Sequence, residues 1–375
     1  MSELTRPGDD HPTARAQAIE AARQAIVRAE AAACEDRVDE ALALYAEAGG
    51  LPLDDAAGLA VRADALRGAG IVHQSRAQWT EAQRHYQLAR EVAIELGDDV
   101  RIGRADNCLG AVAFESGDWP AAERHYAEAR RAGEAAGDLQ LLAQLENNVG
   151  TMLAARGERE EAEAAFRRAL ERFEKLGSNP CVARVLTNLG LVLVQQGRLP
   201  LAATAYERAL AECKRHGDAM FAAKILINQS RMFLARKDGI QAHAAAMKAW
   251  AFARRLEDGP VAAGALCLLG EVALAFRDHV GAIYYLRRAL NLAARDKAPL
   301  MEAETWVQIG NLYHEQGKLA RAVDTWRFAR LCYRRLGADP EDARLAERID
   351  SVEREAKTLE TVAEARVGTG GAYAT

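Results

Sequence analysis

Catalysis and metal binding require several titratable side chains that the fold brings together, and this sequence offers few such sets. Its six cysteines are widely separated along the chain, so no Cys-x-x-Cys spacing for a metal or redox site occurs. His85 and His125 each stand directly before an aromatic residue, at the same place in two repeated segments, which favours a structural role. No Walker loop, His-Glu-x-x-His motif, nucleophile elbow or dinucleotide loop is present. We therefore expect no enzyme activity, no metal site and no cofactor.

The charged residues are typical of solvated helix faces. The acid-rich runs at 158–161 and 353–355 alternate with bases at helical spacing. With 49 Lys and Arg against 54 Asp and Glu, the formal net charge is −5, so no overall basic field exists to hold nucleic acid or an anionic membrane. The N-terminal segment lacks an apolar core, and no uncharged apolar run long enough to span a membrane follows. We expect a cytoplasmic chain that binds neither nucleic acid nor a membrane.

Three asparagines, Asn148, Asn188 and Asn228, follow one another at equal intervals along the chain. Asparagine is a mediocre helix former that carries both a hydrogen-bond donor and an acceptor, so a stacked series suggests bonding to an extended peptide backbone. The alternative is that each asparagine bonds only the neighbouring repeat. In both cases the equal spacing requires a repeated structural element that positions the side chains.

Small residues define that repeat. Seven markers recur with the same 40-residue period, and an alanine follows each marker at the twelfth and again at the nineteenth position. A large residue stands at the sixteenth position after six of the markers. This small-large-small stripe, at spacing four and then three, lies on one face of a helix. The markers are Gly70, Gly110, Gly150, Gly190, Ser230, Gly270 and Gly310.

Each repeat is therefore predicted to be a helical hairpin. A glycine at the seventh position after several markers, for example Gly117 and Gly157, ends the first helix, and Pro120 and Pro200 suit the first turn of the second. Aromatic residues make up only 6% of the chain, which argues against a sheet core. A long coiled coil is excluded because its heptads would be broken at the end of every predicted helix. These patterns predict an all-α fold.

The pattern resembles the tetratricopeptide repeat, whose signature combines a Leu-Gly pair with a later alanine, an aromatic residue and a second alanine. Here the signature appears as Leu109-Gly110…Ala122…Tyr126…Ala129, and two repeats later as Leu189-Gly190…Ala202…Tyr206…Ala209. The period is longer than that of the usual repeat, which has roughly 34 residues. It is similar to that of kinesin light chains, Leu-Gly-Asn-repeat adaptors and bacterial peptide-sensing regulators. The resemblance implies an α-solenoid, a right-handed superhelix of antiparallel helical hairpins.

This organisation divides the chain into five parts. Residues 57–336 hold seven repeats, and 14–56 repeat the stripe without its glycine, so they are expected to form a degenerate N-terminal capping hairpin. The highly charged residues 340–366 suit a C-terminal capping helix; whether that helix turns back into the groove is left open. We expect disorder in residues 1–13 and 367–375.

The resemblance also implies where a ligand binds. In this family the first helix of each hairpin lines a concave groove, and the positions six, three and two before the marker and one after it face the ligand. At these positions the middle repeats carry bases and asparagines but no acid, so the expected ligand is an acidic, extended peptide. The predicted peptide-binding residues are Arg104, Asn107, Asn147, Asn148, Arg184, Asn188, Lys224, Asn228 and Arg231.

The outer repeats differ, because they carry Asp64, Glu271 and Glu304 at the equivalent positions. These acids would confine the binding site to the middle repeats.

The sequence thus favours a non-enzymatic scaffold for protein–protein interaction. Two alternatives stay open: a sensor or regulatory subunit of a bacterial signalling or transcription-control system, and a self-assembling structural protein. Neither the partner nor the oligomeric state is predicted.

Overall fold

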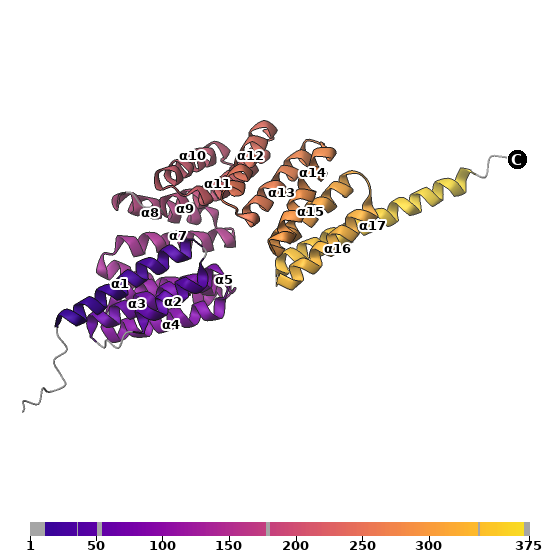
Figure 1. The fold of residues 1–375 in the computed structure, drawn as a ribbon. Helices are drawn as coiled ribbons and strands as arrows, with labels where there is room; N and C mark the ends of the chain where they lie inside the picture. Colours follow the sequence, from indigo (N-terminus) through magenta and orange to yellow (C-terminus); the bar gives the residue numbers. More distant parts are fainter. Residues whose placement is uncertain (1–11, 36, 51–54, 178–180, 337, 371–375) are drawn as a thin grey trace, which may run out of the picture. The chain divides into compact units, whose positions relative to one another are not determined.

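The computed structural model describes residues 12–370, except 36, 51–54, 178–180 and 337 (Figure 1). This part of the chain forms 17 α-helices, and no strand occurs among the described residues. The prediction of an all-α solenoid built from hairpins is confirmed. The chain divides into two compact units, unit 1 with residues 1–192 and unit 2 with residues 193–375.

Unit 1 contains helices that pair in sequence order as hairpins. Odd-numbered helices are called A helices here and even-numbered ones B helices. From α1 to α8, each A helix packs on the B helix that follows, and each of these hairpins contacts the next (Figure 1). The helices are α1 (Pro12–Cys34), α2 (Val38–Gly49), α3 (Ala56–Ser75), α4 (Trp79–Leu96), α5 (Asp99–Glu115), α6 (Trp119–Ala136), α7 (Leu139–Arg156), α8 (Arg159–Lys175) and α9 (Cys181–Gln195), the last of which runs across the boundary between the units.

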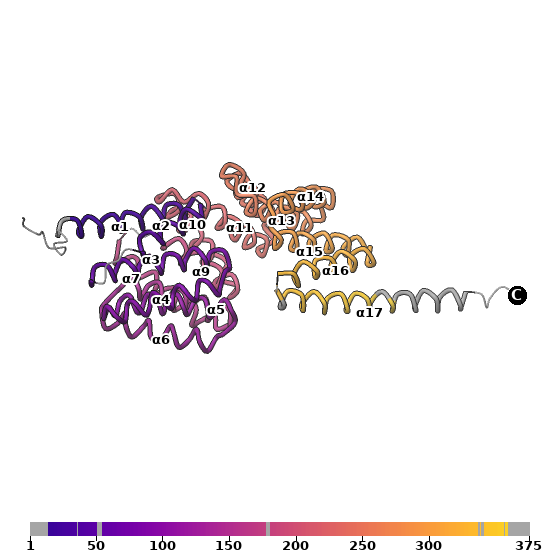
Figure 2. Tube along the Cα trace, turned by 60° about the horizontal axis from the view of Figure 1, so that its bottom comes forward, coloured from indigo at the N-terminus to yellow at the C-terminus, as the bar shows by residue number. Residues whose placement is uncertain are grey.

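Unit 2 has the same construction. In Figure 2 α15, α16 and α17 follow one another as neighbouring rows, in agreement with their contacts. The helices are α10 (Leu199–His216), α11 (Ala219–Ala235), α12 (Gly239–Arg255), α13 (Gly259–Ala275), α14 (His279–Arg295), α15 (Pro299–Glu315), α16 (Leu319–Leu336) and α17 (Asp339–Gly370).

The marker glycines lie where the two helices of one hairpin touch. A Cβ atom on Gly110 would stand 2.6 Å from the ring of Tyr126, which lies on the partner helix, so any side chain there would force the ring to move. Ser230 fills the remaining marker position, and its repeat has Ala246 in place of the large residue. The Ser230 hydroxyl donates a hydrogen bond of 2.7 Å to the carbonyl of Ala242, so the serine uses space that a ring occupies elsewhere.

The hairpins from α3 to α16 turn through a residue in the left-handed backbone region. Gly117 and Gly157 take φ values of +80° and +85°, as their sequence positions predict. Lys237 and Arg277 stand at the same place in other repeats and take φ values of +60° and +59° without being glycine. The turn conformation is therefore a property of the repeat, and glycine only makes it easier.

Aspartates cap the N-termini of many of these helices. Their carboxylates accept a hydrogen bond from the backbone N–H three residues later, which satisfies one otherwise unpaired donor. The capping residues are Asp55, Asp98, Asp118, Asp138, Asp218, Asp238, Asp258 and Asp278.

Buried ion pairs join neighbouring hairpins in unit 1. Arg90 on α4 donates to both carboxylate oxygens of Asp106 on α5, each at 3.0 Å. One repeat later Arg130 on α6 donates to Glu146 on α7 at 2.6 Å, and Arg168 donates to the other oxygen of Glu146 at 2.8 Å. Asp106 and Glu146 are buried, so these bonds compensate charges that have left water.

The ends of the chain complete the stack. α1 and α2 form a hairpin in the range of the expected N-terminal cap, and α1 begins at Pro12, inside the segment expected to be disordered. α17 packs on α16 and runs from Asp339 to Gly370, beyond the predicted 340–366, so the first part of the predicted C-terminal tail is helical. The rest of both predicted disordered segments lies outside the described residues.

Candidate peptide-binding face

The predicted binding positions lie on the A helices, and their surface is called the A-helix face here. In unit 1 it holds Arg104 and Asn107 on α5, Asn147 and Asn148 on α7, and Arg184 and Asn188 on α9. In unit 2 it holds Lys224, Asn228 and Arg231 on α11.

The asparagines of unit 1 form a chain of side-chain hydrogen bonds. The amide of Asn148 donates to Asn107 at 3.1 Å, and the amide of Asn188 donates to Asn147 at 3.0 Å. Asn147 donates to Asn148 at 3.4 Å, which links the two bonds. The chain connects α5, α7 and α9, so these asparagines bond neighbouring hairpins, as the alternative interpretation of the sequence holds.

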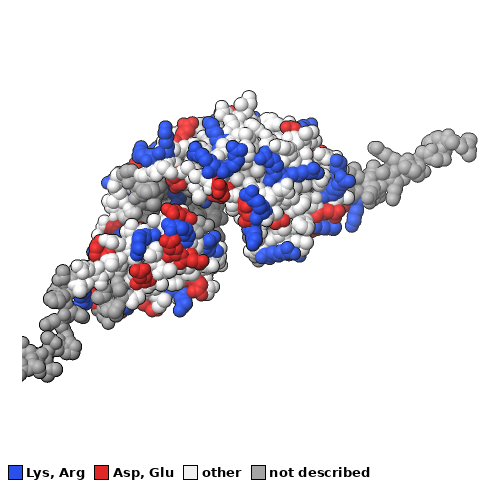
Figure 3. All heavy atoms as spheres, in the orientation of Figure 1, with Lys and Arg blue, Asp and Glu red and all other residues white. Residues whose placement is uncertain are grey.

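The bases of the A-helix face differ in how far they are compensated. Arg104 donates to Asp138 at 2.9 Å, and this ion pair offsets its charge. Arg184 in unit 1 and Lys224 in unit 2 are exposed to solvent. Over the α13–α16 region of unit 2, on the side of the molecule shown in Figure 3, Lys and Arg predominate over Asp and Glu among the charged residues, although the whole chain is acidic.

A small cavity of about 140 Å³ opens on the A-helix face of unit 2. Eight of its nine lining residues stand at the positions that the family uses for ligands, on α11, α13 and α15. The ninth, Tyr333, comes from α16. The lining residues are Arg231, Gly264, Cys267, Leu268, Glu271, Glu304, Val307, Gln308 and Tyr333.

Burial raises the pKa values of several side chains that line this cavity. Desolvation raises the pKa of Glu271 and of Glu304, and the nearby Arg231 opposes both shifts. Desolvation also raises the pKa of Tyr333 to about 12 and that of Cys267 to about 12. Glu271 and Glu304 were expected to mark the end of the site, whereas the structure places them in one cavity with the predicted residue Arg231.

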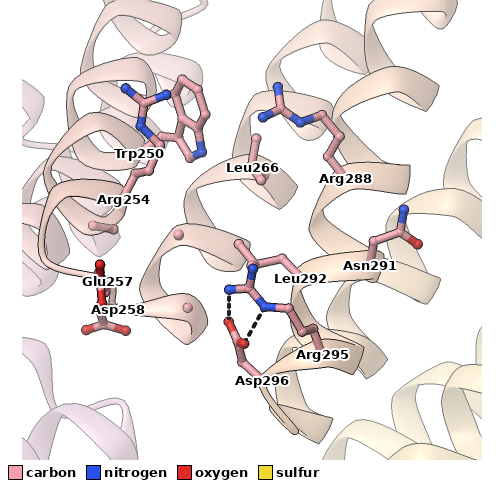
Figure 4. Close-up of a pocket in the computed structure, with 13 residues that line it drawn as sticks. Trp250, Arg254, Glu257, Asp258, Leu266, Arg288, Asn291, Leu292, Arg295 and Asp296 are labelled. Carbon is pink, nitrogen blue, oxygen red and sulfur yellow. Dashed lines mark hydrogen bonds and ion pairs between the residues drawn. The ribbon is translucent and has the colours of Figure 1, made fainter.

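A larger cleft of about 820 Å³ lies among α12, the start of α13 and α14 (Figure 4). Its upper wall is Trp250, and the guanidinium groups of Arg254 and Arg288 lie 4.9 and 5.1 Å from that ring. Lower in the cleft, Arg295 is paired with Asp296 (Figure 4). The sequence did not predict this cleft. Its residues do not stand at the repeat positions that the family uses to bind ligands.

The histidines singled out by the sequence make contacts within the hairpins. His125 Nδ1 lies 2.8 Å from Asp106, and the ring of His85 stacks on His73 with centroids 5.1 Å apart. In the described part of the chain, no three His, Cys, Asp or Glu side chains gather closely enough to hold a metal ion. None of the described helices is long and apolar enough to cross a membrane.

Comparison with known families agrees with the repeat geometry. The tetratricopeptide repeat family matches three overlapping segments, residues 61–135, 101–173 and 141–214. Residues 61–214 are tetratricopeptide repeats. The resemblance drawn from the Leu-Gly pairs is thereby confirmed, and the same hairpin geometry continues past the matched tetratricopeptide repeats through α16. No curated protein matches the sequence.

Solved structures with the tetratricopeptide-like fold resemble this chain at low identity. BtubC (BKLC) from P. vanneervenii is 22% identical, with a TM-score of 0.52, over 60% of this chain and 92% of that one. A Rap protein in complex with Competence and Sporulation Factor is 14% identical, with a TM-score of 0.58, over 90% and 98%. The Rap conjugation gene regulator of plasmid pLS20, in complex with a Phr peptide, is 18% identical, with a TM-score of 0.58, over 82% and 87%. At these identities the likeness shows a shared fold.

Proposed function

We propose that this protein is a non-catalytic interaction scaffold, which binds an extended segment of a partner protein along its A-helix face. The observation that carries the proposal is the lining of the 140 Å³ cavity, because eight of nine residues come from the positions that tetratricopeptide repeats use for ligands. Stacked hairpins offer such extended surfaces for recognition without any catalytic group.

The exposed bases set the expected charge of the segment. Arg184 in unit 1 and Lys224 in unit 2 attract acidic side chains, whereas Arg104 contributes less because Asp138 already compensates it. Asn228 on α11 is partly buried and makes no hydrogen bond with the described residues, so its amide is available to a peptide backbone. In unit 1 the bonded asparagines keep part of their bonding capacity, because an amide can make more bonds than the one or two seen here.

The test uses short acetylated peptides in which each position is varied through Glu, Gln, Lys and Arg. Binding to the full chain is measured by fluorescence polarisation. We expect Glu-containing peptides to bind. The Lys224→Ala variant should weaken them most at low ionic strength, because an exposed charge is screened by salt. The Asn228→Ala variant should weaken binding roughly tenfold at every ionic strength, because a peptide group loses its partner.

Lys248→Ala is the matched control, since Lys248 is an exposed lysine on the B helix α12. Helicity measured by circular dichroism must stay unchanged in all variants. Binding that survives both Lys224→Ala and Asn228→Ala would place the ligand away from the A-helix face and contradict the proposal.

A further inference from the structure

Two carboxylates in the 140 Å³ cavity have no bonded partner in the described part of the chain. Glu271 on α13 and Glu304 on α15 are partly buried, and neither makes a hydrogen bond or an ion pair with the described residues. By contrast, the buried Glu146 of unit 1 bonds Arg130 and Arg168. A carboxylate that loses water without gaining donors is unfavourable, so Glu271 and Glu304 are incompletely satisfied.

The charges around the cavity do not balance. Arg231 lines the same cavity and acts electrostatically on Glu271 and Glu304, so one positive charge accompanies two negative ones. Glu341 of α17 adds further negative potential at Glu304. One additional cation would bring the three groups that line the cavity to neutrality.

The other residues that line the cavity suit a long basic side chain, with its charged end group and its apolar methylene chain. The cavity has room for several water molecules and therefore for an ammonium or guanidinium group. Tyr333 lines it with only 6% of its surface exposed, and its hydroxyl has no hydrogen-bond partner among the described residues. Leu268 and Val307 supply apolar wall for the methylene stem. Gln308 also lines the cavity, but its amide oxygen already accepts a hydrogen bond of 2.9 Å from Asn311.

We propose that this cavity receives a lysine or arginine side chain of the bound segment, held between Glu271 and Glu304 with the Tyr333 hydroxyl as an acceptor. This inference rests on the proposed function and adds a specificity pocket to it. The exposed Lys224 on α11 and the acids on α13 and α15 then give the face of unit 2 opposite charges at its two ends. A bound segment would place its acidic residue near Lys224 and its basic residue in the pocket. The order of these two residues along the segment would therefore fix the direction in which its chain runs.

The same varied peptides test the pocket. At one peptide position, Lys or Arg should bind wild type roughly tenfold more tightly than Gln, because a charge-assisted hydrogen bond forms. The double variant Glu271→Gln/Glu304→Gln should lose this preference while still binding the Gln peptide. Glu302→Gln is the control, because it replaces one glutamate of α15 that does not line the cavity.

A pH series supplies an independent readout. Desolvation raises the pKa of both carboxylates above their ordinary range, so they ionise late as pH rises. Cys267 and Tyr333 keep their charge state in this range, because burial raises the pKa of each to about 12. The preference for Lys should therefore grow from pH 5 to pH 7 in wild type and stay flat in the double variant.

The outcomes separate the two proposals. If none of the peptides binds wild type, both the proposed function and the basic pocket are wrong. If peptides bind but show no preference for Lys or Arg, or keep it in the double variant, the pocket alone is wrong and the interaction scaffold stands.

Discussion

Glu146 is fully buried, and arginines compensate its charge. Arg130 and Arg168 bond it at 2.6 and 2.8 Å, and Arg172 lies 3.7 Å away. Burial would raise the pKa of Glu146, but the hydrogen bonds from Arg168 and Arg130 outweigh burial and lower the pKa below its ordinary value. The carboxylate thus stabilises the fold only while it is ionised.

The first prediction follows from this linkage. A depressed pKa in the folded state means that the stabilisation is complete above the ordinary pKa of glutamate and is lost as pH falls through the lower, folded value. The variant Glu146→Gln should therefore lower the free energy of unfolding by about 1–3 kcal/mol at neutral pH. The difference from wild type should shrink in acid, as measured by urea unfolding between pH 7 and pH 3.

Glu171→Gln serves as the control, because Glu171 is exposed and pairs with Lys175 at the surface. Its unfolding curve should match wild type. An equal loss in both variants, or a loss in Glu146→Gln that does not change with pH, would show that the arginine cluster does not stabilise the fold.

Among individual residues, the sequence predicted the marker glycines correctly but did not predict the buried ion pairs. Gly110 and its equivalents were recognised because only a missing side chain permits the contact with Tyr126. Asp106 and Glu146 were overlooked, although both stand at the same position shortly before a marker, and their partners Arg90 and Arg130 also share one repeat position. Aligning the repeats at these two positions would have revealed the pairs. No alignment could show the cavity that joins Arg231, Glu271 and Glu304, because it depends on side-chain packing across three helices.

Among the elements, the hairpin turns show a conformation held by their context. Lys237 has a φ value of +60°, in a region that costs a residue with a side chain about 1–2 kcal/mol. Gly157 occupies the same place in another repeat with a φ value of +85° and without strain. The helices on both sides fix the turn, so a residue that disfavours the conformation adopts it anyway.

The second prediction compares opposite substitutions at this turn. Lys237→Gly should raise the free energy of unfolding by up to about 1 kcal/mol, because it removes backbone strain. Gly157→Ala should lower it by a similar amount, even though no atom lies within 4 Å of the new Cβ. Urea unfolding measures both. Destabilisation by Lys237→Gly would mean that the added flexibility of the unfolded chain outweighs the strain.

For the whole molecule, the C-terminal helix closes the stack of unit 2. Leu345, Ile349 and Val352 of α17 are buried in one cluster with Trp326 and Tyr333 of α16. α17 thus packs on its neighbour α16 (Figure 2). Because Tyr333 also lines the cavity, the cap and the proposed pocket share a wall.

The third prediction is that removal of residues 339–375 loosens unit 2 locally. In a stack of hairpins each repeat contacts only its neighbours, so the loss of α17 should expose α16 and weaken α15 first. Amide hydrogen exchange measured by mass spectrometry should rise in α15 and α16, while the helices of unit 1 keep the exchange rates of the full chain. Faster exchange throughout both units would show that the chain unfolds as one cooperative body.

The sequence predicted the all-α solenoid and its 40-residue period, because small residues that cannot be replaced without a clash set that period. The division between residues 192 and 193 could not be predicted in this way. The physical reason is that the small-residue pattern concerns contacts within a hairpin, and it continues unbroken through Gly190 and Ser230.

The buried pairs Arg90–Asp106 and Arg130–Glu146 have a consequence for how such a gene can change. The next repeat has Leu170 and Leu186 at the equivalent positions, both buried, so the junctions between repeats are of two chemical kinds. Unequal recombination that deleted residues 139–178 would keep the period but set Arg130 against Leu186, leaving a cation without its partner. Deletion of a repeat should therefore preserve the stability of the fold at some junctions and lower it at others. The order of the repeats along the gene is constrained for this reason.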